Sequence, residues 1–149
     1  MRIVQADVAR LDEVTPMFIK YREFYGQLPK PEASRRFLEA RLVQEQAIIL
    51  IAEDEDTGKA MGFCQFIPSF SALTLSAAWV LKGIYVTEDA RRQLVADRLI
   101  NHAKELARAA GVERMTVMTG EDNTAAQSLY RSLGFSNDHD FMYFALKLS

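Results

Sequence analysis

The segment from Trp79 to Ile100 constrains this chain most, because its hydrophobic pattern changes period halfway along. Residues 79–86 are apolar, β-branched and aromatic, which predicts a short buried strand. From Val95 onward, apolar residues recur every three or four positions, which predicts a long helix from about Arg91 to Ala110. The sequence therefore predicts a strand that turns sharply into a helix.

The turn between that strand and that helix is polar, and it favours an anion. A helix start presents backbone N–H groups that lack intrahelical partners, together with the positive end of the helix dipole. Arg91 and Arg92 stand at this start and add charge that suits a phosphate group. A solvated pair of arginines at a helix end explains the same residues equally well, so this pattern alone leaves both interpretations open.

The composition excludes several classes of protein. The chain has 149 residues, which predicts a single domain over residues 1–149. A net charge of −2 gives no electrostatic support for a nucleic-acid partner. The one cysteine cannot form an internal disulfide, no apolar run reaches transmembrane length, and the first residues lack a signal-peptide core. We therefore expect a cytoplasmic protein without a membrane partner.

Other patterns predict the remaining elements. The expected strands are 2–6, 47–53, 60–67, 114–119 and 141–148, and the other expected helices are 8–25, 32–44 and 124–133, with Phe37, Leu38 and Leu42 on the buried side of the second. Residues 68–76 are expected to be irregular. The order strand, helix, strand around residue 100 predicts parallel strands with a right-handed crossover. Gly83 inside the central strand predicts a β-bulge or a close approach of another backbone.

The aromatic residues Tyr21 and Tyr25 end the first helix, and they predict either a core edge or a wall of a substrate pocket. Cys64 lies in the middle of a strand and is expected to be a small core residue. His139 is expected to be exposed in a turn, and His102 has no ligand set at metal-binding spacing. We therefore predict no metal site.

The end of the chain carries its most specific motif. The pattern Asn123-x-x-Ala126-x-x-Leu129-Tyr130-x-x-x-Gly134-Phe135 resembles the motif that closes the GNAT superfamily of N-acetyltransferases. Upstream, Arg91-x-x-Leu94-x-Ala96 resembles part of that superfamily's acetyl-CoA segment. The order of the elements is also similar over nearly the whole chain.

The resemblance implies an α/β fold: a single GNAT-type domain with a mixed central sheet of about six to seven strands, flanked by about four helices. It implies acetyl-CoA as cosubstrate, and Tyr130 as the acid that protonates the leaving thiolate; the alternative for Tyr130 is packing on the last strand. It implies that Asn123 holds the pantetheine arm, caps the helix, or does both. The residues implied to bind acetyl-CoA are Ile84, Tyr85, Val86, Arg91, Arg92, Gln93, Leu94, Val95, Ala96, Asp97 and Asn123.

Leu94 departs from the superfamily pattern, which has glycine at this position. Glycine allows the backbone to approach the pyrophosphate without a Cβ atom in the way. Leucine either narrows that approach or points inward as a core residue, because a helix start needs no positive φ. The sequence leaves open whether Leu94 weakens acetyl-CoA binding.

The acceptor amine must be neutral to attack, because an alkylamine with a pKa near ~10 is mostly charged at neutral pH. Candidates for the base are Tyr25, Tyr85, Glu121 and Asp122, and the expected substrate-binding residues are Tyr21, Tyr25 and Glu121. Acidic groups around the acceptor site would attract a cationic amine.

The resemblance implies an acyltransferase that moves an acetyl group from acetyl-CoA to a primary amine by direct attack. The acceptor is open between a polyamine-like amine, an amino acid, an antibiotic and a protein amine. The alternative is a degenerate GNAT domain that acts as an acyl-CoA sensor or a protein-interaction module without catalysis. A homodimer, supported by Phe141, Tyr143 and Phe144 on the final strand, is compatible with each of these.

Overall fold

The computed structural model describes residues 1–138 and 140–149, so the predicted exposure of His139 falls outside the described residues. Two compact units divide the chain, residues 1–118 and residues 119–149. The strands are β1 (Arg2–Gln5), β2 (Ile48–Glu53), β3 (Ala60–Ser71), β4 (Ser76–Val86) and β5 (Arg114–Val117). The helices are α1 (Leu11–Phe24), α2 (Pro31–Val43), α3 (Val95–Ala109) and α4 (Thr124–Ser132), with short 3-10 turns at Val8–Arg10 and Glu88–Ala90.

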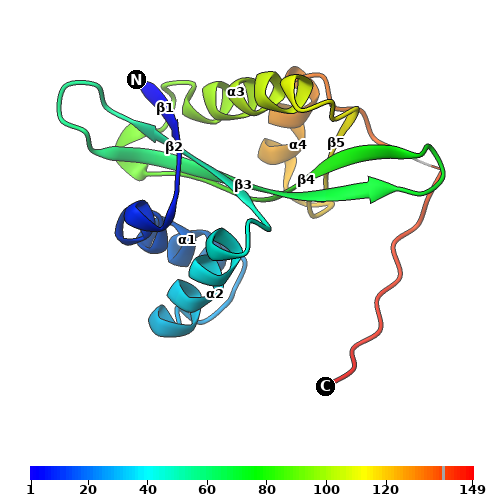
Figure 1. Cartoon of the computed structure of the whole chain (residues 1–149), viewed down its shortest axis with the longest axis horizontal. Coiled ribbons are helices and arrows are strands. Elements are labelled where there is room, and N and C mark those ends of the chain that lie inside the picture. The colour runs from blue at the N-terminus through cyan, green and yellow to red at the C-terminus, as the bar shows by residue number, and fades with distance from the viewer. Residues whose placement is uncertain (139) are drawn as a thin grey trace. The chain divides into compact units, whose positions relative to one another are not determined.

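The first unit is a mixed sheet in the order β1-β2-β3-β4-β5. The first four strands pair antiparallel, whereas β4 and β5 are parallel, as the strand–helix–strand order predicted. Helices α1 and α2 cover one face of the sheet and α3 covers the other (Figure 1). Successive side chains of β2 point to opposite faces of the sheet. Ile49 and Ile51 pack with residues of α1 and α2, and Leu50, which stands between them in the sequence, is also fully buried.

The sheet has five strands in the described part of the chain, so the predicted six to seven is wrong. The segment 141–148, predicted as a final strand, forms no strand. Its β-branched and aromatic content is typical of a strand, but a strand also needs a neighbour with which to exchange hydrogen bonds. Within residues 119–138 and 140–149 the structure has a helix and no strand that would serve as that neighbour.

Strand β3 continues through the segment 68–71, where the sequence suggested irregular structure. Pro68 pairs with Trp79 on β4, whereas the pairing of β3 with β2 ends at Phe66. Beyond Phe66, one edge of β3 therefore has no strand beside it within residues 1–138 and 140–149, and a proline, which lacks an N–H group, is tolerated there. Cys64 is fully buried, and burial raises the pKa of its thiol, in agreement with the predicted core role.

Candidate functional site

The predicted bulge in β4 is present, and it lies at Lys82. Gln65 on β3 pairs with Gly83 and the next residue, Phe66, pairs with Leu81, so Lys82 has no opposite residue. The Tyr21 hydroxyl donates a hydrogen bond to the Lys82 carbonyl at 3.1 Å, and the Tyr21 ring lies 3.5 Å from the position that a Cβ on Gly83 would take. The bulge is therefore held against helix α1.

Beyond the bulge, β4 has an edge without a strand partner in the described part of the chain. Its pairing with the parallel strand β5 covers Ala78–Leu81 and stops there. The predicted cofactor residues Ile84, Tyr85 and Val86 follow on this open edge and remain paired with β3 on the other side. Backbone groups on such an edge are available to a ligand, because no neighbouring strand takes their hydrogen bonds.

The turn that follows β4 has a left-handed backbone at two positions. Arg92 has φ +64° and Leu94 has φ +61°, in a backbone region that residues other than glycine seldom adopt. Helix α3 begins at Val95 rather than near Arg91, because these conformations cannot continue a right-handed helix. Leu94 is the N-cap residue, and 70% of its side chain is exposed. The expectation that it serves as a core residue without positive φ is therefore wrong.

The start of α3 presents backbone donors, as the sequence predicted. The N–H group of Arg98 bonds to the Leu94 carbonyl at 3.0 Å, which makes it the first intrahelical bond of α3. The N–H groups of Val95, Ala96 and Asp97 precede that bond and have no intrahelical acceptor. A leucine side chain cannot cap them, so an anion is a suitable partner.

Two polar side chains of the turn donate hydrogen bonds to nearby backbone carbonyl groups. Arg91 Nε donates to the Val86 carbonyl at 3.3 Å, and its guanidinium lies 5.9 Å from the centre of the Tyr85 ring. Gln93 Nε2 donates to the Asp89 carbonyl at 3.2 Å. These contacts hold the turn against the end of β4. The predicted phosphate contacts of Arg91 and Gln93 stay predictions.

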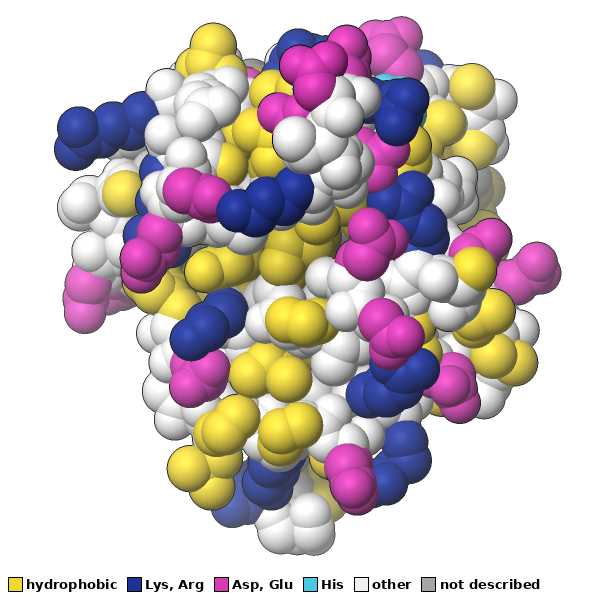
Figure 2. Space-filling model, turned by 90° about the vertical axis from the view of Figure 1, so that its left-hand side faces the viewer, with side chains coloured by type: hydrophobic (Ala, Val, Ile, Leu, Met, Phe, Trp, Pro, Cys, Tyr) yellow, Lys and Arg dark blue, Asp and Glu magenta, His cyan; other side chains and the backbone are white. Residues whose placement is uncertain are grey.

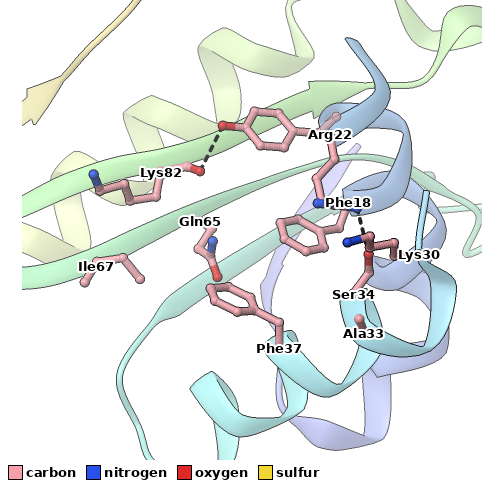
Figure 3. A pocket seen from close by; sticks show the side chains of 10 residues that line it. Phe18, Arg22, Lys30, Ala33, Ser34, Phe37, Gln65, Ile67 and Lys82 are labelled. Carbon is pink, nitrogen blue, oxygen red and sulfur yellow. Dashed lines mark hydrogen bonds between the residues drawn. The ribbon is translucent and has the colours of Figure 1, made fainter. Parts of the chain in front are cut away.

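A cavity of about 480 Å³ opens beside the bulge, between α1, α2 and the strands β3 and β4 (Figure 3). Phe18 and Tyr21 from α1 and Phe37 from α2 form its aromatic wall, with the Phe18 ring centre 6.2 Å from that of Tyr21 and 5.9 Å from that of Phe37. Phe37, predicted to be core, is 46% exposed because it lines this cavity. The ring centre of Tyr25 lies 5.2 Å from that of Tyr21, but Tyr25 does not line the cavity.

Burial raises the pKa of Tyr21, with a further contribution from Tyr25. A phenol with a raised pKa stays protonated at neutral pH, so Tyr21 acts as a hydrogen-bond donor there and not as a base. Sequence reasoning missed the lining residues Lys30, Gln65 and Lys82. Gly83 did mark the bulge at Lys82, but no sequence pattern indicated that Lys30 and Gln65 meet beside it.

The second unit contains the other predicted residues. Asn123 Oδ1 accepts a hydrogen bond from the Ala126 N–H at 3.2 Å, so the predicted capping role is confirmed. Tyr130 is 8% exposed, and its ring centre lies 5.7 Å from that of Phe135. The Glu121 carbonyl accepts from Gln127 Nε2 at 2.9 Å. The roles of Asn123 in cofactor binding, Tyr130 as acid and Glu121 in substrate binding stay predictions.

The described residues contain no group of three or more side chains that could hold a metal ion, and no helix among them is long and apolar enough to cross a membrane. On the face shown in Figure 2, basic and acidic side chains are interspersed with apolar ones. That face therefore has no broad patch of positive charge of the kind that nucleic acid requires.

Comparisons with known proteins agree with this geometry. The model of the acetyltransferase (GNAT) family matches residues 13–135. An uncharacterized N-acetyltransferase of Bacillus subtilis, YhfO, is 34% identical over 148 residues, which cover 99% of this chain and 98% of the relative. A crystal structure of a probable acetyltransferase is 50% identical, with a TM-score of 0.94, and the match covers 100% of this chain and 99% of the other.

A solved aminoglycoside N-acetyltransferase in complex with CoA shares the fold, with 21% identity and a TM-score of 0.83 over 98% of this chain and 94% of that one. Together with the open edge of β4 and the helix start that follows it, these matches lead to one conclusion. The chain belongs to the acetyltransferase (GNAT) family and is an N-acetyltransferase.

Proposed function

We propose that the chain transfers an acetyl group from acetyl-CoA to a primary amine by direct attack on the thioester. The observation that supports this most is the open edge of β4 beyond Leu81, followed after the turn of residues 87–94 by a helix start with unsatisfied N–H groups. The edge of β4 provides hydrogen-bond donors for a carbonyl oxygen, and the start of α3 provides donors for a phosphate. Acetyl-CoA carries both groups on one extended molecule.

The residues of the turn fit this ligand, in spite of Leu94. Leu94 adopts the left-handed conformation that the superfamily's glycine favours, so the backbone path of the turn does not depend on glycine. The pyrophosphate would be held by N–H groups between Arg92 and Asp97. Acetyl-CoA supplies an activated acetyl group: the amine forms a C–N bond with the acetyl carbon, the C–S bond breaks, and CoA leaves as a thiol.

The chain's own residues then stabilise charge and move protons. An N–H group between Ile84 and Val86 would donate to the acetyl oxygen as negative charge develops there. The Tyr130 hydroxyl would donate a proton to the departing sulfur, and the proton that the amine nitrogen loses as the C–N bond forms would restore the phenol. A thiol has a pKa near ~8.5 and leaves readily, so we assign this acid a modest share of the rate.

Calorimetric titration with acetyl-CoA, with free CoA for comparison, tests the proposed function first. We expect binding in the micromolar range and, in the presence of an accepted amine, release of one CoA thiol per acetylated amine. Binding without thiol release against a broad amine panel would favour the sensor alternative. The absence of binding to either ligand would favour a protein-interaction module.

A homodimer also remains a proposal. Phe141, Tyr143 and Phe144 are 68%, 75% and 84% exposed, and such exposed apolar segments are typical of contact surfaces. Light scattering should give a mass near twice that of the chain, and removal of residues 141–149 should return it to one chain. A wild-type mass of one chain at micromolar concentration would contradict the dimer.

A further inference from the structure

The cavity beside the bulge has the size and shape of a small-molecule site. Its volume of about 480 Å³ lies within the range of about 300–1,000 Å³ that such sites occupy. It reaches Lys82, two residues before the predicted thioester contact at Ile84. An amine bound here would lie next to the strand that is proposed to hold the acetyl group.

The charged side chains that line the cavity are all basic. Arg22, Lys30 and Lys82 line it, whereas no aspartate or glutamate does so among the described residues. None of the three takes part in an ion pair within residues 1–138 and 140–149. This differs from the interspersed charges of Figure 2, and positively charged walls would repel a polycationic amine.

Arg22 is oriented by neutral acceptors. Its Nη1 atom donates to the Leu28 carbonyl at 2.6 Å, to the Pro29 carbonyl at 3.0 Å and to Ser34 Oγ at 3.2 Å. These contacts fix the guanidinium at the rim of the cavity without cancelling its charge. An anionic group on the ligand would do so.

Gln65 provides an independent observation. It is 2% exposed, it lines the cavity, and its Oε1 atom is buried without a hydrogen-bond partner in the structure. Figure 3 shows its side chain in the middle of the lining residues, between Phe37 and Lys82. A buried amide oxygen requires a donor, because it has lost its hydrogen bonds to water and gains none in return. An N–H group of the substrate amine is a suitable donor.

Much of the remaining wall is apolar. Phe18, Phe37 and Ile67 surround Gln65 and can bury a hydrophobic side chain of the ligand (Figure 3). A ligand that satisfies the whole cavity therefore has three parts: an amine, an anionic group and an apolar body. A polyamine or an aminoglycoside has the wrong charge for these walls.

We propose that this cavity is the acceptor site and that the acceptor is an amino-acid-like amine with a carboxylate and an apolar side chain. The carboxylate faces the cations, the amine donates to Gln65 Oε1, and the side chain lies against Phe18 and Phe37. The surrounding positive charge lowers the pKa of the bound ammonium group, which favours the neutral nucleophile. This inference rests on the proposed acetyl transfer, and it names the substrate class.

Matched pairs of amines test the proposal. Acetylation would be followed by CoA thiol release for both enantiomers of phenylalanine and leucine, each against its decarboxylated amine, with spermidine as a polycation. At least one amino acid should exceed its decarboxylated counterpart by about 10-fold or more in kcat/KM, the size of one hydrogen bond to a charged group. Equal values within every pair, or a preference for spermidine, would overturn the proposal.

Lysine variants locate the effect in the cavity. Lys82→Met and Lys30→Met should each lower the ratio of kcat/KM between the amino acid and its decarboxylated counterpart, by about 10-fold for the lysine closer to the carboxylate. Lys20→Met is the matched control, because Lys20 is an exposed lysine of α1 outside the cavity and should leave the ratio intact. An equal ratio in the wild type and in all three lysine variants would contradict the assignment of the carboxylate to this cavity.

Gln65→Met separates ligand binding from a structural role. Methionine has a similar volume and lacks the unpaired oxygen, so Tm should not fall, whereas the KM for the amino acid should rise about 5- to 10-fold. A lower Tm with unaltered KM would make Gln65 structural. Calorimetry with acetyl-CoA distinguishes the two failures: no cofactor binding refutes the proposed transfer, whereas cofactor binding without carboxylate preference refutes only the acceptor class.

Discussion

The turn before α3 and the cavity beside α2 flank the same strand, β4, but they are built from different chemical groups. The turn offers backbone N–H groups, whose positions depend on φ and ψ at Arg92 and Leu94. The cavity offers side chains from four elements: three cations, an amide oxygen and an aromatic wall. If the turn holds acetyl-CoA and the cavity holds the acceptor, as we propose, cofactor binding should tolerate a departure such as Leu94, whereas acceptor selection should depend on single side chains. Variants should separate the two regions.

Tyr130→Phe should have the largest effect on turnover, and Tyr130 lies in neither the turn nor the cavity. Loss of the acid is expected to lower kcat about 10- to 100-fold, at or below the low end of acid–base catalysis because a thiolate leaves readily. The Kd for acetyl-CoA, from calorimetry, should stay within about twofold. Tyr143→Phe, an exposed tyrosine of the same unit, is the control. Parallel losses in kcat and in cofactor affinity would make Tyr130 structural.

Tyr21→Phe should act on the cavity alone. Without the 3.1 Å hydrogen bond to the Lys82 carbonyl, the bulge loosens and the KM for the amine should rise about 3- to 5-fold, while acetyl-CoA affinity is retained. Because burial raises the pKa of Tyr21, the phenol is protonated near neutral pH. The acidic limb of the kcat/KM profile should therefore persist in the variant.

Tyr25→Phe is the matched control for that experiment, since Tyr25 neighbours Tyr21 but does not line the cavity. It should change KM less than twofold. Disappearance of the acidic limb in Tyr21→Phe would instead identify Tyr21 as the base and would contradict its assignment as a donor.

Leu94→Gly should have the smallest effect and should act on the turn alone. Glycine removes the strain of a leucine with positive φ, but it also increases the conformational entropy of the unfolded chain. The net result should be a rise in the free energy of unfolding of up to about 1 kcal/mol. Removal of the side chain should tighten acetyl-CoA binding no more than about threefold. Denaturant unfolding and calorimetry measure the two quantities.

Leu75→Gly provides a close control, because Leu75 is a second exposed leucine with positive φ, in the hairpin between β3 and β4. It should gain similar stability without any change in acetyl-CoA affinity. A tenfold gain in acetyl-CoA affinity for Leu94→Gly would show that leucine obstructs the pyrophosphate. It would contradict the proposal that the turn tolerates leucine at this position.

Some of the site was predictable because its causes are local. Gly83 indicated the bulge, Asn123 indicated a helix cap, and the change of period after Val86 indicated the strand–turn–helix unit. The start of α3 was placed four residues early, since periodicity does not reveal positive φ at Arg92 and Leu94. The aromatic pattern at Tyr21 and Tyr25 suggested a pocket wall, of which only Tyr21 forms part.

The sequence by itself determined the elements whose residues interact within a turn or two: the helix stripes, the alternating strands, the caps and the family motif. The tertiary structure alone decided the cavity, because Phe18, Lys30, Gln65 and Lys82 lie far apart in the chain and meet only when α1 and α2 pack on the sheet. It also decided that segment 141–148 forms no strand, since strand pairing depends on a neighbour that local propensity cannot supply.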